Sequence, residues 1–263
     1  MIESDADRRV SGSVIWRTSL GVLRRCGAVV QVRPGYLVVT TPENPDYHWG
    51  NCLVVTSGDV DDAAGWLDVF AREFPQATHR AIGFLPRPDV QAWADVGITL
   101  ETERALTSET PIAPTPAPAG YTVGPVRGTG WDAILDAAWA DGPGTDEYRR
   151  FNERRLAAER RVVEAGQAEW FAAWTADGDL VASLGIVMLN DEARYQSVLT
   201  DAAHRRRGLA RHLLGVASAW AFGHGATRLV IVADEGQGGD RLYRAAGFVP
   251  GDVECAVYVG HVD

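Results

Sequence analysis

The hydrophobic positions of this chain follow two periods. Runs in which apolar and β-branched residues alternate or follow one another predict strands, and apolar residues three or four positions apart predict amphipathic helices. In the first part of the chain, these patterns predict strands at residues 28–41, 51–56, 80–85 and 98–106. They predict helices at residues 61–74 and 88–96, the first with Asp61 and Asp62 near its N-terminus, where acidic side chains favour a helix.

The second part of the chain repeats this order with more elements. Strands are predicted at residues 121–126, 169–175, 180–189, 193–200 and 228–233, with final strands within residues 248–261. Helices are predicted at residues 131–139, 146–165, 207–222 and 238–246. The helix at residues 207–222 has the most regular apolar stripe, which contains Leu209, Leu213, Val216, Ala217 and Trp220. Together these elements predict a mixed α/β domain whose front half is largely antiparallel.

A proline-rich segment separates the two parts. It contains Pro111, Pro114, Pro116 and Pro118, which favour extended backbone and remove the hydrogen-bond donors that a helix or a central strand needs. We interpret the segment as a semi-rigid linker. The expected domains are therefore residues 1–110 and residues 121–263, joined by a linker at residues 111–120.

Composition restricts the class of protein. With 263 residues, of which 46% are hydrophobic, the chain can form one large or two ordinary domains with a packed core. It has no apolar run near the ~18 residues that a membrane-spanning helix needs, and its acidic N-terminus does not resemble a signal peptide. The expectation is a cytoplasmic protein without a membrane partner, and the sequence leaves its oligomeric state open.

Charge and cysteine content exclude further classes. The net charge of −10 disfavours nucleic acid as a partner and suits a cationic substrate such as an amine. All 25 basic residues are arginines, so no lysine can act as a nucleophile. The three cysteines, Cys26, Cys52 and Cys255, are far apart in the sequence and fit neither a metal site nor a disulfide framework. We expect reduced thiols and no metal.

The segment Arg205-Arg206-Arg207-Gly208-Leu209-Ala210 joins a predicted strand to the most regular helix. The first backbone N–H groups of a helix lack intrahelical partners and lie at the positive end of the helix dipole, so they bind a diphosphate readily. Gly208 allows a ligand to approach the backbone closely, and the arginines, with Arg211, add positive charge. The segment predicts a phosphate-binding loop; the alternative is a solvated basic turn that caps a helix.

This segment resembles the acetyl-CoA signature of the GNAT N-acetyltransferase superfamily, Q/R-x-x-G-x-G/A, which Arg205, Gly208 and Ala210 match. Further along the chain, Leu242-Tyr243-Arg244-Ala245-Ala246-Gly247-Phe248 resembles the family's L-Y-x-x-x-G-F element. The resemblance covers residues 121–258. It departs from the family's frequent residues at three positions, Ala202, Asp234 and Asp240.

The resemblance implies where acetyl-CoA would bind. The backbone of Val198, Leu199 and Thr200 would hold the pantetheine arm and the thioester carbonyl. The diphosphate would lie on the loop and first helical turn, formed by Arg205, Arg206, Arg207, Gly208, Leu209, Ala210 and Arg211. The implied fold has two GNAT-like domains, each a mostly antiparallel central sheet flanked by helices, with the acetyl-CoA site in the second.

The same resemblance implies a catalytic acid. The hydroxyl of Tyr243 would protonate the departing CoA thiolate, since a phenol with a pKa near ~10 can donate to a thiolate. The alternative is a tyrosine that packs the last helix against the core. For the base that takes a proton from the amine, Glu192 is the first candidate, and Asp191 and Glu169 are further ones. Each of these carboxylates can also be read as an ordinary turn or surface acid.

The first half has a similar order of elements but no analogue of the R-x-x-G-x-G/A loop, so it resembles the degenerate half of tandem family members. In its turn at residues 44–51, Tyr47, His48 and Trp49 either line an acceptor pocket or pack the turn against the core. We predict an N-acetyltransferase that transfers the acetyl group of acetyl-CoA to a small-molecule or peptide amine by direct attack. The alternative is an acyl-CoA-binding regulatory or sensor protein without turnover.

Overall fold

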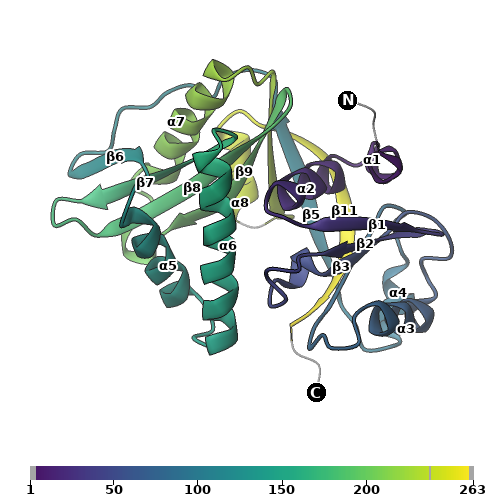
Figure 1. Ribbon diagram of the computed structural model, residues 1–263. Coiled ribbons are helices and arrows are strands. Elements are labelled where there is room, and N and C mark those ends of the chain that lie inside the picture. The colour runs from purple at the N-terminus through teal and green to yellow at the C-terminus, as the bar shows by residue number, and fades with distance from the viewer. Residues whose placement is uncertain (1–3, 237, 261–263) are drawn as a thin grey trace. The chain divides into compact units, whose positions relative to one another are not determined.

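The computed structural model describes residues 4–236 and 238–260, which form two compact units (Figure 1). Of these residues, the first unit contains 4–105, 233–236 and 251–260, and the second contains 106–232 and 238–250. The boundaries fall inside three strands, β5 (Leu100–Ser108), β10 (Arg228–Asp234) and β11 (Val249–Val259). In this division residues 251–260 belong to the first unit, whereas the sequence predicts one domain at residues 121–263.

The helices of the first unit are α1 (Asp5–Val10), α2 (Val14–Arg25), α3 (Ala63–Glu73) and α4 (Val90–Ala94), with a 3-10 helix, η1, at His48–Gly50. Its complete strands are β1 (Val29–Arg33), β2 (Tyr36–Thr40), β3 (Cys52–Val55) and β4 (Arg80–Phe84). The predicted elements of this region are confirmed, and the predicted strand at residues 28–41 is a hairpin that turns at Gly35, with φ +84°. Helices α1 and α2 are additional to the predicted elements, although Trp16, Leu20 and Leu23 of α2 have helical spacing.

The sheet of the first unit combines antiparallel and parallel pairing. Strands β1, β2 and β3 pair antiparallel in this order, and α3 then connects β3 to β4, which pairs parallel to β3. Residues 255–259 of β11 lie antiparallel beside β4, with Cys255 opposite Phe84 and Val259 opposite Arg80. This pairing explains why residues 251–260 belong to the first unit.

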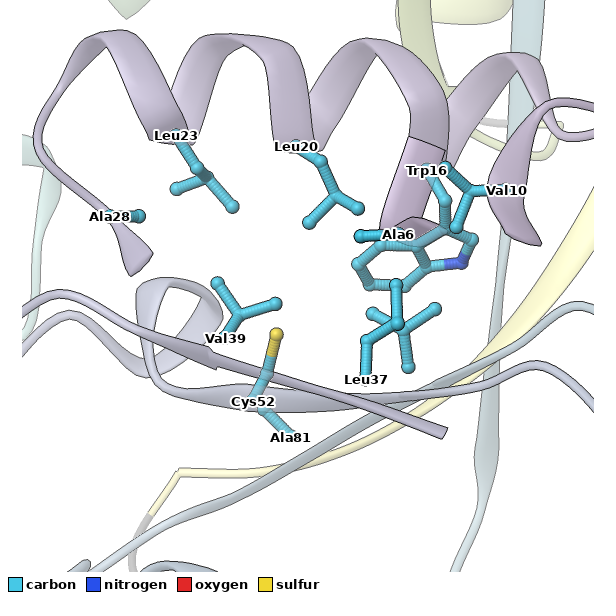
Figure 2. Close-up of a cluster of buried hydrophobic side chains, with 11 residues drawn as sticks. Ala6, Val10, Trp16, Leu20, Leu23, Ala28, Leu37, Val39, Cys52 and Ala81 are labelled. Atoms are coloured by element: carbon cyan, nitrogen blue, oxygen red, sulfur yellow. The ribbon is translucent and has the colours of Figure 1, made fainter. Parts of the chain in front are cut away.

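Helix α2 contributes an apolar surface to the core of the first unit (Figure 2). Trp16, Leu20 and Leu23 belong to one buried cluster with side chains of β2, β3 and β4, among them Leu37, Val39, Cys52 and Ala81. The indole of Trp16 lies on the backbone of β4, since a Cβ added at Gly83 would be 1.8 Å from the ring carbon Cζ2. The first unit therefore has a hydrophobic core of its own.

The helices of the second unit are α5 (Gly130–Asp141), α6 (Asp146–Glu164), α7 (Leu209–Gly223) and α8 (Gly238–Ala245), with a 3-10 helix, η2, at Ala202–His204. Its complete strands are β6 (Tyr121–Pro125), β7 (Ala168–Thr175), β8 (Leu180–Leu189) and β9 (Glu192–Thr200). The predicted helices and strands are confirmed here to within a few residues. The final strands predicted within residues 248–261 form the single strand β11, and residue 261 lies outside the described residues.

The sheet of the second unit repeats the arrangement of the first. Strands β6, β7, β8 and β9 pair antiparallel in this order, and α7 connects β9 to β10, which pairs parallel to β9. Trp131 of α5 packs against Trp170 of β7 with ring centroids 5.7 Å apart, whereas Tyr195 of β9 donates a hydrogen bond of 2.8 Å to the carbonyl of Leu214 in α7. By the strand register these contacts lie on opposite faces of the sheet. The predicted mixed α/β fold is confirmed.

A β-bulge interrupts β9 at Ser197. The register with β8 shifts between Ser183 and Gly185, and Ser197 has a left-handed φ of +48°. A bulge inserts an extra residue into one strand and bends it. The bulge therefore changes the direction of β9 just before its last three residues, which lead into the loop that follows.

Candidate functional site

The loop between β9 and α7 contains two left-handed residues. Arg206 has a φ of +63° and Gly208 a φ of +85°. Near the start of the loop, the carboxylate of Asp201 accepts a hydrogen bond from Ala203 N at 2.8 Å. Gly208 is the N-cap residue of α7, and glycine adopts this conformation without the steric penalty that a Cβ brings. A glycine at position 208 therefore suits the sharp entry of the chain into the helix.

The N-terminus of α7 has no side-chain cap. Gly208 offers no cap hydrogen bond, and the first turn contains no acidic residue. The first intrahelical bond runs from His212 N to Gly208 O at 2.9 Å, and the amides of Leu209, Ala210 and Arg211 precede it. Such amides lie at the positive end of the helix dipole and lack intrahelical acceptors. This helix end therefore has the properties of an anion-binding site.

The crossover β3–α3–β4 of the first unit differs at the same point. The N-cap residue of α3 is Asp62, whose carboxylate accepts a hydrogen bond from Gly65 N at 3.0 Å. Two more carboxylates accept backbone bonds nearby, Asp59 from Asp61 N at 3.1 Å and Asp61 from Asp89 N at 2.7 Å. Because carboxylates occupy this helix end and repel phosphate, it does not suit an external anion.

Three of the predicted arginines differ in their surroundings. Arg205 donates from Nε to the carbonyl of Thr200 at 3.1 Å, so it turns back toward the end of β9. Arg211 donates to the carbonyl of Ala245, which connects the first turn of α7 with the end of α8. Arg206 is exposed and makes no hydrogen bond or ion pair with another described residue. Its side chain is therefore available to a ligand at the surface of the loop.

The fourth arginine, Arg207, is held by two acceptors. It donates to the hydroxyl of Tyr121 at 3.0 Å and to the carbonyl of Ala203 at 3.3 Å. The loop therefore presents a guanidinium with a defined position beside the start of α7.

The three predicted strand residues, Val198, Leu199 and Thr200, lie between the bulge and the loop. Leu199 lines a groove of about 540 Å³, whose other walls are α5, the start of β8 and the residues after β9. The charged side chains that line the groove are all carboxylates, and the remaining positions are small or apolar. The carboxylates belong to Asp136, Asp179 and Asp201. The groove therefore favours a cationic group over an anionic one.

A buried charged group on α6 supports the bulge in β9. Arg155 donates to Ser197 Oγ at 2.9 Å, to Glu159 Oε1 at 2.7 Å and to Asn152 Oδ1 at 3.0 Å. The side chain of Glu159 is 8% exposed, its Oε2 has no hydrogen-bond partner among the described residues, and burial raises its pKa. Arg155 thus connects a buried carboxylate to the residue at the bulge, a role that no sequence motif marks.

Tyr243 lies on α8 with a buried ring. The ring packs edge-on against Phe248 with centroids 6.2 Å apart, and Phe248 packs in the same way against Tyr195 at 5.8 Å. A Cβ added at Gly239 would lie 3.6 Å from the Tyr243 hydroxyl oxygen. The ring is therefore a packed core group, while the hydroxyl lies near the N-terminal end of α8.

A buried carboxylate lies one turn before Tyr243 on the same helix. Asp240 pairs through Oδ2 with Arg244 at 2.9 Å, and its Oδ1 is buried without a hydrogen-bond partner among the described residues. Residues three apart on a helix lie on neighbouring positions of one face. The sequence resemblance marks Asp240 as an unusual residue but assigns it no role.

The structure does not bring Glu192 to the loop. Glu192 begins β9 and Thr200 ends it, so the two residues are roughly 26 Å apart along the strand. The carboxylate is buried and lies 3.6 Å from the guanidinium of Arg228, across from it on β10. A position at the far end of the strand gives Glu192 no geometric support as the base.

The two other candidate carboxylates have structural positions. Asp191 lies in the turn before β9, and its carbonyl accepts a hydrogen bond of 2.7 Å from Thr227 N. Glu169 forms an ion pair with Arg127, with its two oxygens 2.7 and 2.6 Å from the two terminal guanidinium nitrogens. Asp191 thus joins the β8–β9 turn to the residue before β10, and Glu169 joins β7 to the segment that follows β6.

The aromatic turn of the first unit packs against its core. Tyr47 and Trp49 contact the buried cluster around α2, and Trp49 also stacks on Tyr258. His48 stacks on His79 with ring centroids 4.1 Å apart, and its Nδ1 lies 2.9 Å from the Tyr258 hydroxyl. Of the two interpretations of this turn, these contacts favour packing.

Residues 4–236 and 238–260 contain no group of three or more His, Cys, Asp and Glu side chains that could hold a metal ion. The three cysteines are free thiols, and burial raises the pKa of Cys52. Within the same residues, the helices are too short or too polar to cross a membrane.

The part of the chain that contains the loop between β9 and α7 matches a known protein family. Residues 131–248 match the family model described as the acetyltransferase (GNAT) family. They form a GNAT acetyltransferase domain. The match extends from α5 to Phe248 and so includes the bulge, the loop and α8. For these residues, the match to the GNAT family indicates acyl transfer from an acyl-CoA. A search of curated protein sequences gives no match.

Solved structures extend the GNAT likeness to the whole chain. A GCN5-related N-acetyltransferase from Kribbella flavida is 19% identical, with a TM-score of 0.63 over 100% of this chain and 97% of that chain. A tandem GNAT protein from the clavulanic acid biosynthesis pathway is 14% identical, with a TM-score of 0.54 over 93% and 88%. A protein of unknown function from Staphylococcus epidermidis is 10% identical, with a TM-score of 0.67 over 90% and 96%. At these identities the likeness shows the fold alone, and it confirms the predicted fold class.

Proposed function

We propose that this protein is an N-acetyltransferase that transfers the acetyl group of acetyl-CoA to a primary amine. The observation that carries the proposal is the uncapped N-terminus of α7, with Gly208 and the preceding arginines, inside the domain that the GNAT family model matches. We further propose one acetyl-CoA site per chain, because carboxylates occupy the N-terminus of α3 in the first unit. The first unit is then a degenerate GNAT-like domain.

The residues of the loop suit the diphosphate of acetyl-CoA. The amides of Leu209, Ala210 and Arg211 would bind its oxygens, and the guanidinium groups of the loop would balance its charge. The last three residues of β9, beyond the bulge, would supply backbone groups for the thioester arm. In this arrangement the thioester carbonyl is polarised by a backbone N–H near Leu199 or Thr200.

The transfer forms one bond and breaks another. The amine nitrogen attacks the thioester carbonyl carbon, the C–S bond breaks, and CoA leaves as a thiolate. We propose that the Tyr243 hydroxyl gives its proton to this thiolate and later regains one from solvent. Direct attack of this kind needs no covalent enzyme intermediate.

The attacking amine must also lose a proton, and a carboxylate can accept it directly or through water. Glu192 begins β9, far from the loop that follows this strand, and we propose Asp240 in its place. It is buried on the same helix as Tyr243, and its Oδ1 lacks a hydrogen-bond partner among the described residues. If Asp240 is the base, the rate defect of Asp240→Asn should shrink at high pH, where the acceptor is already a neutral amine. A defect that does not change with pH would remove Asp240 from this role.

The groove beside Leu199 favours a class of acceptor. Its charged lining is acidic, which attracts ammonium groups, and its other walls are small or apolar. We propose an acceptor with at least one cationic group besides the reacting amine and an apolar portion. Small polyamines, amino-sugar compounds and basic peptides belong to this class.

The decisive experiment measures binding and turnover in the same preparation. Calorimetric titration of the full chain with acetyl-CoA should give about one equivalent bound, and thiol release should rise with some members of an amine panel. Failure to bind acetyl-CoA would overturn the proposed site. Tight binding without thiol release from any amine would favour the alternative function, an acyl-CoA-binding regulatory or sensor protein.

A further inference from the structure

The proline-rich segment lies along α7 instead of crossing open solvent. Residues 112–120, hereafter the strap, run from the C-terminal end of the helix to its N-terminal end. Two hydrogen bonds of 2.8 Å fix the strap, one from its backbone N–H to a serine hydroxyl and one from a histidine ring to its backbone carbonyl. Along α7 the contacts pair Ile112 with Ser218, Thr115 with His212, and Pro118 with Gly208.

The close fit between strap and helix depends on a small residue. A Cβ added at Gly215 would lie 3.5 Å from the carbonyl oxygen of Ala113 and from Cα of Pro114, so the strap backbone passes directly over this position. Ile112 is buried at the point where the strap begins. The strap is therefore part of the domain that contains the loop, and its end has a fixed position relative to that loop.

The strap leads into Tyr121, the first residue of β6, which pairs with Thr175 of β7. The Tyr121 hydroxyl lies 2.9 Å from His204 Nδ1 and accepts a hydrogen bond of 3.0 Å from Arg207. Because the guanidinium is the donor to this oxygen, the hydroxyl can donate its own hydrogen to His204. Tyr121 thus connects the strap to two residues of the loop, one on each side of its left-handed Arg206.

This contact restricts the side chain of Arg207 before a ligand binds. An arginine loses rotamer freedom when it binds an anion, and a side chain that is already restrained loses less. Arg207 is exposed and donates from its two terminal nitrogens to Tyr121 and Ala203, and a guanidinium has five N–H donors, so donors remain for a phosphate oxygen. Arg206, by contrast, is unrestrained by any described partner.

We propose that Tyr121 is a positioning residue that holds Arg207 in place for the diphosphate of the acyl donor. This inference rests on the proposed function, because it assigns the diphosphate to the loop. It also gives the proline-rich segment a role in donor recognition, since the strap fixes the end from which Tyr121 extends.

The experiment compares two acetyl donors. Dissociation constants for acetyl-CoA and for S-acetylpantetheine, which has the thioester arm but no diphosphate, are measured by calorimetry on the full chain. Tyr121→Phe keeps the ring and removes the hydroxyl, so it should weaken acetyl-CoA binding roughly three- to tenfold and leave S-acetylpantetheine binding unchanged. Added to Arg207→Met, the same change should have little further effect, because the two residues act through one contact. With any accepted amine, Tyr121→Phe should raise KM for acetyl-CoA and leave kcat nearly unchanged.

The matched control is Tyr36→Phe in the first unit, which also removes a tyrosine hydroxyl that contacts a charged side chain, at 2.8 Å from Glu73. It should leave both dissociation constants unchanged. If the parent prefers acetyl-CoA to S-acetylpantetheine but Tyr121→Phe keeps both affinities, or weakens both equally, the positioning role is overturned while the proposed function stands. If the parent binds the two donors equally well, the loop does not read the diphosphate, and the proposed site itself fails.

Discussion

Two helix N-termini, that of α3 in the first unit and that of α7 in the second, have the same place in the order of elements. Each helix connects two parallel strands, β3 to β4 and β9 to β10. Helix α3 begins at Asp62, whose carboxylate accepts a backbone hydrogen bond, whereas α7 begins at Gly208 without a side-chain cap and after three arginines. The first helix satisfies a backbone donor internally, and the second leaves its donors for an external anion.

The difference between the two helix N-termini shows that the topology of a crossover does not determine whether it binds an anion. Both crossovers have the same topology, so the capacity to bind a phosphate group depends on the few residues at the helix start. An N-cap carboxylate stabilises a helix by about 1 kcal/mol, and α7 forgoes this contribution. A helix end that stays open at such a cost is consistent with a ligand that supplies the missing contacts when it binds.

The largest expected effect comes from a comparison of α4 and α8, the helices that follow the two crossovers. Only α8 carries a proposed catalytic residue. In the first unit, α4 carries Trp93, which is fully buried and donates to the carbonyl of Val60 at 3.1 Å. In the second unit, α8 carries Tyr243, the proposed acid. Tyr243→Phe should lower kcat about 10²- to 10⁴-fold and change acetyl-CoA affinity little, as measured by thiol release and calorimetry.

The control for Tyr243→Phe is Tyr195→Phe, a tyrosine in the same aromatic group whose hydroxyl donates to the carbonyl of Leu214. It should lower the free energy of unfolding by about 1–3 kcal/mol and leave kcat unchanged. An unchanged kcat for Tyr243→Phe, when product release is not limiting, would reduce Tyr243 to a packing residue.

The second prediction compares α2 with α6. Helix α2 faces the core of its unit with Trp16, Leu20 and Leu23 (Figure 2), whereas α6 buries Glu159 beside the half-buried Arg155. Arg155→Met should leave the Glu159 carboxylate buried without its partner and reduce the free energy of unfolding by about 3–5 kcal/mol, measured by denaturant titration. Arg160→Met removes the same kind of pair, with Glu164, from the exposed part of the helix and should cost at most about 0.5 kcal/mol.

A double variant sharpens this test. Arg155→Met/Glu159→Leu gives α6 an apolar surface like that of α2, and it should recover most of the lost stability. It still lacks the contact with Ser197, so acetyl transfer should remain below the parent level if the bulge positions the donor. Full recovery of both properties would mean that the bulge needs no support from Arg155.

The fold was predictable wherever its signal is local. The stripe of α7 and the apolar runs of β8 and β9 are periodic over many residues, and the structure contains them nearly as predicted. The partner of the last strand was not predictable, because Cys255 pairs with Phe84 and no local pattern specifies so distant a contact. The strap was predicted as a semi-rigid linker from its prolines, but its packing on α7 depends on Gly215 and Ser218, which lie far away in the sequence.

The candidate site shows the same limit. The loop was found because a short motif, a strand before it and a helix after it are adjacent in the sequence. Glu192 was chosen because it is close to the loop in sequence. It begins the strand that leads to the loop, however, so the extended backbone of β9 separates the two. The roles of Arg155 and Tyr121 were not predictable. Their partners, Ser197 and Arg207, belong to other elements, and no sequence motif indicates these contacts.

The third prediction makes the second crossover resemble the first. Gly208→Asp adds a carboxylate at the start of α7, where it repels the diphosphate. It should weaken acetyl-CoA binding about a hundredfold, since like charges a few ångström apart repel by about 1–4 kcal/mol near a protein surface. Gly208→Asn, which tolerates a left-handed conformation equally well, separates charge from shape and should weaken binding less. Equal affinities for the parent and Gly208→Asp, with an unchanged circular dichroism spectrum, would contradict the placement of the diphosphate.

The smallest expected effect comes from the reverse change in the first crossover. Asp62→Ala removes the cap of α3 and should lower the free energy of unfolding by about 1 kcal/mol, or the melting temperature by about 2–4 °C. Asp62→Asn keeps an oxygen that can accept the bond from Gly65 N and should retain most of that stability. Neither variant should create a second acetyl-CoA site, because Asp59 and Asp61 still surround the helix end and no arginine-rich loop precedes it. Calorimetry should therefore still give one acetyl-CoA per chain, and a second equivalent bound by Asp62→Ala would mean that a single carboxylate is all that silences the first unit.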